Sequence, residues 1–358
     1  MERLRTLMED GVADGVFPGA TLIVSKMGRT VFSHTAGWRR IVPTRSPLRE
    51  DTIFDLASLT KPLITTSAVM SLIDSGKLSL DDTLPEVIPS VIPEPKQYIR
   101  IGYLLSHCSG MPAWHPFYLA LEAVPKPLRK TELRRMLCAL PLEALPSVKV
   151  LYSDLGFMIL EWVVECLTSM DLSGYITKNL LSPLGLKRTF LLQSAHGFPN
   201  EEFAATEECP WRRRILEGET HDENAWALGG FSGHAGLFGT AGEVNFLLNL
   251  LLSHYKGKRR DFFRPDTVRE FFERRDSTGE SSWALGWDTP SPTGSSSGRF
   301  FSKKSVGHLG FTGTSVWIDL QREICVTLLT NRVHPKRENI KIRAFRPLIH
   351  DMVMEQFC

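Results

Sequence analysis

The chain lacks long apolar runs and any concentration of charge of one sign. Its longest apolar stretches, such as Leu248-Asn-Leu-Leu-Leu252, are far too short to span a bilayer. Basic and acidic residues number 42 and 40, and the longest basic block is Arg212-Arg-Arg214. The sequence therefore gives no support to binding of nucleic acid or of an anionic membrane.

Closely spaced cysteines and an amino-terminal apolar segment are also missing. The six cysteines contain no Cys-x-x-Cys pair, which argues against a disulfide framework and a zinc site; they are Cys108, Cys138, Cys166, Cys209, Cys325 and Cys358. The start, Met1-Glu-Arg-Leu-Arg5, carries no apolar region of the signal-peptide type. We therefore expect a cytoplasmic protein, or a periplasmic or secreted one if a leader has been trimmed.

The order of the expected elements indicates the fold class. An amphipathic helix at the start precedes a β-hairpin over 20–34, and a mostly helical region follows. Strands return at 283–287, 314–319 and 324–329, and an amphipathic helix with Ile340, Ile349 and Val353 closes the chain. Helices are expected in the middle region at 63–75, 100–107, 130–139, 154–168, 172–180 and 242–254.

This order predicts an α+β fold with an inserted all-α subdomain. The terminal pieces, 1–57 and 275–358, would form one antiparallel sheet flanked by the two terminal helices. Residues 58–274 would form the mostly helical subdomain. We expect the active site in the cleft between the two parts.

A serine and a lysine lie three residues apart in the run Asp55-Leu-Ala-Ser-Leu-Thr-Lys-Pro62. On a helix, Ser58 and Lys61 share one face. A serine hydroxyl becomes a good nucleophile when a base removes its proton, and a partly desolvated lysine is such a base. A plain helix cap at Ser58 is the alternative explanation.

Two positions in the chain fit the Ser-x-x-Lys pattern, and their contexts differ. Pro62 is compatible only with the first turn of a helix, so a helix over 64–73 must begin near Ser58. Ser253 and Lys256 instead follow an apolar run and indicate a helix end. The Ser58 pattern is therefore the one with a nucleophile at the positive end of a helix.

Two further segments supply other reactive groups. Val150-Leu-Tyr-Ser-Asp-Leu-Gly156 places the phenol of Tyr152 and the carboxylate of Asp154 before a helix, where Asp154 can act as the cap or contact substrate. Val306-Gly-His-Leu-Gly310 enters an expected strand, along which glycines allow close approach of a substrate backbone.

In this order, the three segments resemble the serine β-lactamase and penicillin-binding-protein superfamily, specifically its class C branch. That branch includes D-Ala-D-Ala carboxypeptidases and β-lactamase-like esterases. The resemblance spans nearly the whole chain. It extends to Phe17-Pro-Gly-Ala20, Leu104-Leu-Ser-His-Cys-Ser-Gly110, His221-Asp-Glu-Asn-Ala225 and Gly233-His-Ala-Gly-Leu-Phe-Gly239.

The resemblance implies a role for each matching residue. Ser58 would be the acyl-forming nucleophile, and Lys61 and Tyr152 would manage its proton, with either as the formal base. We expect their pKa values to be shifted down or coupled in a dry cleft. The oxyanion hole would be the backbone N–H groups of Ser58 and of Phe311, on the strand after Gly310. Asp154, His308 and Gly310 would contact substrate, with no cofactor and no metal.

Two departures from the family pattern bear on the substrate. The family has Tyr-x-Asn where this chain has Tyr152-x-Asp154. The lysine of the family's Lys-Thr-Gly form is here His308, as in its His-x-Gly form. An ionised Asp154 and a neutral imidazole both disfavour an anionic substrate. We therefore expect a serine hydrolase of small esters or amides that prefers neutral esters.

Two alternatives to this function remain. One is a D-Ala-D-Ala carboxypeptidase or weak β-lactamase that uses the same residues. The other is a penicillin-recognising binding module without turnover, which an intact Ser58, Lys61 and Tyr152 disfavour. Three further histidines, His107, His221 and His234, lack the short spacing of metal ligands. We expect these histidines to make structural hydrogen bonds.

Overall fold

The structure is a computed structural model that describes residues 1–193, 197–275 and 281–358. A six-stranded antiparallel sheet with the order β3-β2-β1-β11-β10-β9 forms its centre. Its strands are β1 (Gly19–Lys26), β2 (Arg29–Arg40), β3 (Ser46–Pro47), β9 (Ser305–Leu309), β10 (Ser315–Asp319) and β11 (Ile324–Thr330). Strand β1 pairs with β11, so the two ends of the chain meet in the middle of the sheet.

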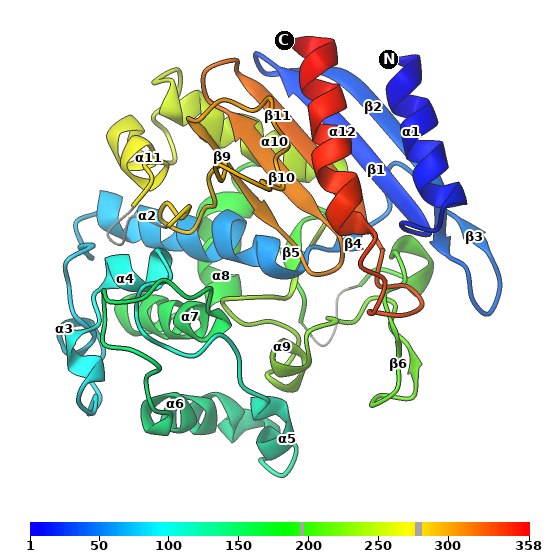
Figure 1. The fold of residues 1–358 in the computed structure, drawn as a ribbon. Coiled ribbons are helices and arrows are strands. Elements are labelled where there is room, and N and C mark those ends of the chain that lie inside the picture. Colours follow the sequence, from blue (N-terminus) through cyan, green and yellow to red (C-terminus); the bar gives the residue numbers. More distant parts are fainter. Residues whose placement is uncertain (194–196, 276–280) are drawn as a thin grey trace.

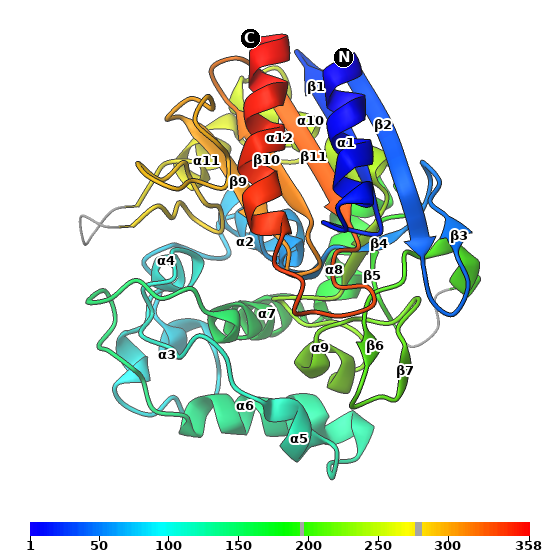
Figure 2. The same cartoon turned by 45° about the vertical axis from the view of Figure 1, so that its right-hand side comes forward.

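The two terminal helices cover one face of this sheet. Helices α1 (Glu2–Ala13) and α12 (Ile342–Phe357) lie side by side on it (Figures 1 and 2). Leu4 and Met8 of α1 and Ile349 and Val353 of α12 are buried in one apolar cluster with Leu22 and Val326 of the sheet. This arrangement confirms the predicted α+β fold class and both terminal helices.

The opposite face of the sheet packs on the helical region. Helix α10 (Ala241–Tyr255) contacts β1 and β11 directly. A single apolar cluster continues from Val316 and Leu329 of the sheet through α2 (Thr66–Asp74) to α7 (Asp154–Thr168). The division at residues 57 and 274 stays a prediction. Within 58–274, helix α10 lies against the sheet.

The predicted helices and the hairpin agree well with the structure, because both have strong hydrophobic periodicity. The other helices are α3 (Leu84–Val87), α4 (Ile101–Leu105), α5 (Phe117–Leu121), α6 (Arg129–Ala139), α8 (Leu172–Ile176), α9 (Glu223–Ala227) and α11 (Pro265–Phe271). Short strands β4 (Phe54–Asp55), β8 (Leu237–Gly239) and β5 (Phe190–Leu191) form a second sheet, and β6 (Glu208–Cys209) pairs with β7 (Arg214–Ile215).

The predicted strand at 283–287 is wrong. Gly286 has a φ of +78°, and the N–H of Ala284 donates to the carbonyl of Trp287 over 2.8 Å. The segment therefore turns back on itself and forms one isolated bridge, between Trp283 and Asp288. Apolar content alone suggested a strand, and the left-handed glycine overrides it. Ile340 also lies before α12 and is 57% exposed.

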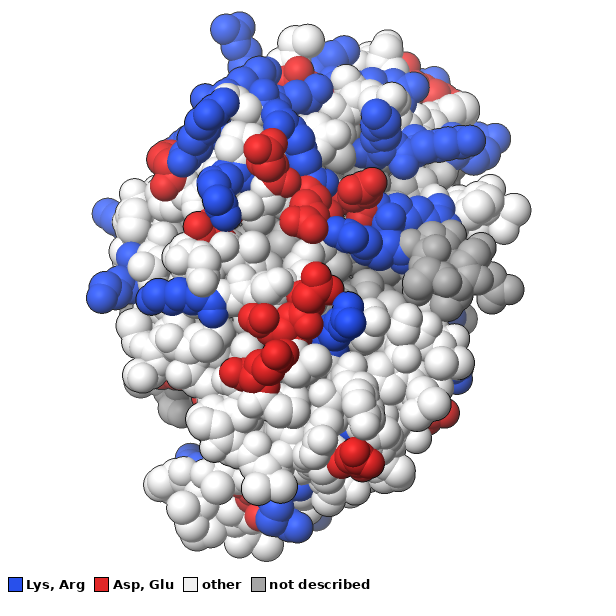
Figure 3. Space-filling view, turned by 90° about the vertical axis from the view of Figure 1, so that its left-hand side faces the viewer, with Lys and Arg blue, Asp and Glu red and all other residues white. Residues whose placement is uncertain are grey.

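The surface and the cysteines agree with the composition. The six cysteines, all among the described residues, form no disulfide. Figure 3 shows basic and acidic side chains beside one another on one face of the molecule. None of the helices in the described ranges is both long enough and apolar enough to cross a membrane.

Candidate active site

Ser58 lies in a tight helical turn that leads into α2. A 3₁₀ turn over Ala57–Leu59 precedes a π-helical turn over Lys61–Thr65, in which Pro62 sits near the start as the sequence requires. Ala57 has a φ of +48°, a strained conformation for a residue with a Cβ. The carboxylate of Asp55 holds it there by accepting the N–H of Ala57 over 2.8 Å.

Lys61 is fully buried and directs its ammonium group at the serine. Its Nζ donates to Oγ of Ser58 over 2.9 Å and to the carbonyl of His234 over 3.2 Å. A carboxylate oxygen of Asp154 lies 2.7 Å from the same nitrogen. The amine thus has a hydroxyl, a carbonyl and a counter-ion around it.

Tyr152 completes the group of reactive side chains. Its hydroxyl is close enough to Lys61 and Ser58 for both to lower its pKa, and the ammonium nitrogen of Lys61 lies 4.9 Å from the centroid of its ring. Its ring stacks on Trp283 at 5.4 Å between centroids and contacts His107 at 4.7 Å. The structure thus brings Tyr152, from a separate segment, to Ser58 and Lys61.

The electrostatics of this group differ from the downward pKa shifts expected from the sequence. Burial alone would lower the pKa of Lys61, but the nearby carboxylate of Asp154 and the phenol of Tyr152 raise it above its usual range. Burial also raises the pKa of Tyr152, against the opposing effect of Lys61. Only the coupling between the two groups agrees with the expectation.

Asp154 is not the cap of α7, and its role as a substrate contact stays a prediction. The cap of α7 is Ser153, whose hydroxyl accepts the N–H of Gly156 over 3.2 Å. Asp154 is the first residue of α7, and its carboxylate is the ion-pair partner of Lys61. This ion pair could not be predicted from the sequence, because the two residues are far apart along the chain.

His308 lies in strand β9 and Gly310 directly follows it, whereas the sequence predicted a stretch that leads into a strand. The imidazole of His308 bonds the carbonyl of Leu309 through Nδ1 over 2.8 Å, and burial lowers its pKa to about 3. It is therefore neutral at pH 7. At Gly310, an added Cβ would lie 2.0 Å from the hydroxyl of Thr314 and 2.7 Å from the carbonyl of Leu56, so only glycine fits.

Phe311 lies in the turn after β9 and not on the strand itself, since β9 ends at Leu309. Its ring stacks on His221 at 5.5 Å, and the guanidinium of Arg332 lies 4.6 Å from the ring centroid. Nε of Arg332 also donates to the carbonyl of Phe311 over 2.8 Å. Arg332 was not identified from the sequence.

A cavity of about 510 Å³ opens onto Ser58 and Tyr152. Three arginines on its wall were missed: Arg332 after β11, and Arg343 and Arg346 on α12. Their spacing of three on α12 places Arg343 and Arg346 on one face, but only the packing shows that this face meets the cavity. Trp283, His308, Phe311 and Asp288 are further residues of the wall.

The three other histidines have polar partners. His107 accepts the N–H of Ser153 over 3.1 Å, and His234 bonds Asp222 at 3.0 Å. Nε2 of His221 lies 3.2 Å from a carboxylate oxygen of Glu207, and the backbone N–H of His221 donates to the carboxylate of Asp55 over 2.7 Å. Among the described residues, Asp154, Asp222 and His234 are close enough to be metal ligands, with one atom of each within 4.8 Å of the others. The ammonium of Lys61 already balances Asp154 there.

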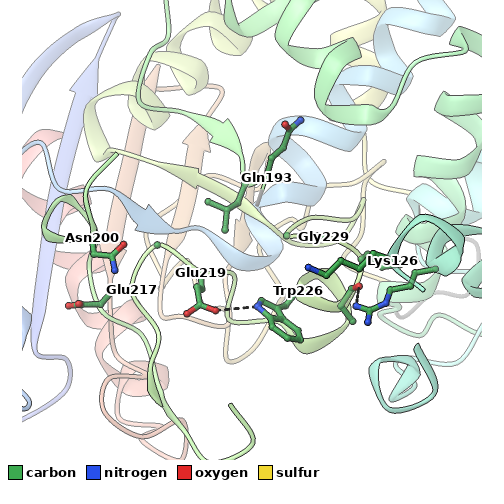
Figure 4. Close-up of a pocket in the computed structure, with 13 residues that line it drawn as sticks. Lys126, Gln193, Asn200, Glu217, Glu219, Trp226 and Gly229 are labelled. Carbon is green, nitrogen blue, oxygen red and sulfur yellow. Dashed lines mark hydrogen bonds between the residues drawn. The ribbon is translucent and has the colours of Figure 1, made fainter. Parts of the chain in front are cut away.

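A second cavity, of about 440 Å³, has a polar wall whose acidic groups are already paired (Figure 4). Glu219 accepts the indole N–H of Trp226 over 3.2 Å, and Glu217 pairs with Arg39 at 3.0 Å. Arg129 donates to the carbonyls of Val124 and Ala227. These groups hold the loops together and leave no reactive combination of side chains.

Comparison with known proteins matches residues 4–349 to a family model described as Beta-lactamase. The chain belongs to the beta-lactamase family. This is a hydrolase family, and the resemblance inferred from the motifs to the wider superfamily is thereby confirmed.

Several relatives of this beta-lactamase family member are similar over most of its length. An "N-acetylmuramyl-L-alanine amidase" of Bacillus subtilis is 32% identical over 93% of this chain and 81% of its own. A "Putative D-alanyl-D-alanine carboxypeptidase" of Salmonella paratyphi A is 32% identical over 92% of this chain and 82% of its own.

Solved structures share the fold at lower identity. EstCE1, described as a hydrolase with promiscuous acyltransferase activity, is 21% identical, with a TM-score of 0.73 over 97% of this chain and 98% of its own. An octameric penicillin-binding protein homologue from Pyrococcus abyssi is 20% identical, with a TM-score of 0.74 over 97% of this chain and 77% of its own. These two likenesses show the fold alone.

Proposed function

We propose that this protein is a serine hydrolase that forms an acyl-enzyme on Ser58 and acts on small esters or amides. The observation that carries the proposal is the hydrogen bond from Lys61 to Ser58 over 2.9 Å, with Tyr152 beside both residues on the wall of a cavity of about 510 Å³. A hydroxyl bonded to an amine, with a phenol close by in a mostly buried cluster, is the arrangement that acyl transfer to serine needs.

In the proposed reaction, Oγ of Ser58 attacks the carbonyl carbon of the substrate and its proton passes to the coupled Lys61 and Tyr152. The oxyanion accepts hydrogen bonds from the backbone N–H groups of Ser58 and Phe311. The leaving group takes up the proton that came from Ser58 as its bond to the carbonyl carbon breaks. Water then attacks the acyl-enzyme and restores Ser58. Either Lys61 or Tyr152 serves as the formal base.

The cavity wall changes the argument about substrate charge. The expectation of neutral esters rested on His308 and on a free Asp154, but Asp154 is paired with Lys61. Arg343 lines the cavity and is exposed, and its guanidinium forms no hydrogen bond or ion pair with the described residues. A cation is therefore available for the carboxylate of a substrate.

A D-Ala-D-Ala carboxypeptidase or weak β-lactamase activity is accordingly the second candidate. It is favoured by Arg343 and by the relatives named for amide hydrolysis of wall peptides. A binding module without turnover is disfavoured, because Ser58, Lys61 and Tyr152 are all in contact.

The test is covalent labelling together with turnover. We expect the wild type to hydrolyse short-chain nitrophenyl esters and to retain a fluorescent penicillin on the peptide that contains Ser58. Ser58→Ala should lose both. Ser253→Ala, at the second Ser-x-x-Lys match on α10, is the matched control and should lose neither. Labelling that survives Ser58→Ala would place the nucleophile elsewhere.

A further inference from the structure

The peptide that joins Gly310 to Phe311 is held from its carbonyl side by a buried arginine. Nη2 of Arg346 donates to the carbonyl of Gly310 over 2.9 Å and to that of Thr314 over 2.9 Å. The carbonyl of Gly310 and the N–H of Phe311 belong to one planar trans peptide and point in opposite directions. A group that fixes this carbonyl therefore fixes the direction of the Phe311 N–H.

Arg346 is an unusual residue for a purely structural contact. It is 6% exposed, and no carboxylate forms an ion pair with it among the described residues. Burial, with the neighbouring charges of Arg332 and Arg343, lowers its pKa to about 9, so it stays cationic at neutral pH. A buried cation without a counter-ion is costly, and here it directs its charge at backbone carbonyls.

Further hydrogen bonds fix the rest of the turn. The N–H of Gly310 donates to the carbonyl of Thr314 over 2.8 Å, and Arg332 holds the carbonyl of Phe311. The hydroxyl of Thr312 donates to the carbonyl of Asp55 over 2.8 Å. Asp55 also bonds the N–H of Ala57, next to Ser58. One network thus joins the turn at Phe311 to the turn at Ser58.

We propose that Arg346 is a positioning residue for the oxyanion hole. It orients the Phe311 N–H, and its charge on the Gly310 carbonyl polarises that peptide and strengthens the N–H as a donor. Hydrogen bonds in series polarise one another in this way, and a preorganised donor needs no rearrangement when the oxyanion forms. The inference rests on the proposed function, because it needs the Phe311 N–H to face a developing oxyanion.

A competing role for Arg346 is direct contact with an anionic group of the substrate, since it also lies on the cavity wall. The two roles differ in one measurable respect. A residue that acts through the peptide affects every substrate, whereas a residue that binds a carboxylate affects only substrates that carry one.

The experiment compares Arg346→Met and Arg346→Lys on a neutral nitrophenyl ester and on nitrocefin. We expect Arg346→Met to lower kcat by a similar factor, about 10- to 100-fold, on both substrates with little change in KM, somewhat less than the loss of a whole oxyanion donor. Arg346→Lys keeps the charge and should recover part of kcat. The infrared carbonyl band of the acyl-enzyme should move to higher wavenumber in Arg346→Met, because the oxyanion donor is weaker.

Arg39→Met is the matched control. Arg39 is also a buried arginine that donates to a backbone carbonyl, that of Phe203, but it lies away from the cavity. It should lower the melting temperature without moving kcat or the carbonyl band. If Arg346→Met does not fold, Arg346→Lys gives the same comparison.

Loss of kcat on nitrocefin alone, or an unmoved carbonyl band, would overturn the role of Arg346 while leaving the acyl-enzyme in place. Absence of any acyl-enzyme in the wild type would instead overturn the proposed function, and this inference with it.

Discussion

A carboxylate oxygen of Asp154 lies 2.7 Å from the ammonium nitrogen of Lys61, inside the structure. The pair explains why the pKa of Lys61 is raised although the side chain is fully buried. At neutral pH the free amine is a minor species. An enzyme that needs this amine as a base should therefore work faster as the pH rises.

We predict that Asp154→Asn shifts the acid limb of the kcat/KM profile to lower pH, by roughly 1–3 units. The shift is to lower pH because the carboxylate of Asp154 raises the pKa of Lys61. With an amide in its place, burial still lowers this pKa, and only the weaker effect of Tyr152 opposes it. Measurement of kcat/KM for one ester between pH 5 and 10 checks it. Asp171→Asn, at the cap of α8, is the control.

A limb that stays in place in Asp154→Asn but disappears in Asp288→Asn would contradict this assignment. Asp288 lines the cavity, and burial raises its pKa to about 6. The titrating group would then be that carboxyl and not Lys61.

We expect Tyr152→Phe to lower turnover by about 10²-fold or more, the range of a general acid–base group. Its hydroxyl is close enough to Ser58 and Lys61 for both to lower its pKa, so its loss removes a route for the proton. The melting temperature should change little. Tyr175→Phe, which removes a hydroxyl bonded to Ser71 over 3.0 Å, should leave turnover unchanged. Activity within about threefold of wild type would show that Lys61 works alone.

Arg343→Met should weaken hydrolysis of carboxylate-bearing substrates selectively. A charge-assisted contact contributes about 1.5–3 kcal/mol, or roughly 10- to 150-fold in kcat/KM. The ratio of kcat/KM for nitrocefin to that for a neutral ester should fall by a factor in this range. An unchanged ratio would mean that Arg343 does not meet the substrate, and would restore the expectation of neutral esters.

Stability should fall as the solution is acidified below pH 6.5. Burial lowers the pKa of His308 to about 3 and that of His350 to about 4, whereas both take up a proton near 6.5 when unfolded. A lowered folded pKa gives stability that is present above 6.5 and lost as the pH falls. The low pKa of each histidine should lower the free energy of unfolding by about 2 kcal/mol between pH 6.5 and pH 5.

Urea unfolding at several pH values checks this prediction. His350→Asn removes one of the titrating groups, so the loss of unfolding free energy between pH 6.5 and 5 should be smaller in the variant than in wild type. Equal slopes in the two proteins would show that His350 does not carry the effect.

The sequence by itself determined the elements whose cause is local. Pro62 restricts the start of the helix at Ser58. The strand-like runs on either side of the turn Lys26-Met-Gly-Arg29 indicate the hairpin of β1 and β2. The order of these elements sufficed for the α+β class. The prediction of a strand over 283–287 was wrong, because Gly286, with its positive φ, turns this apolar run back on itself.

Only the tertiary structure decided the charges and partners in the site. Asp154 pairs with Lys61, and Arg346 with Gly310, through contacts between residues far apart in the chain. No local pattern records which face of α12 meets the turn after β9. The direction of a pKa shift depends on burial and on every nearby charge, so it is set by packing and not by the identity of the residue alone.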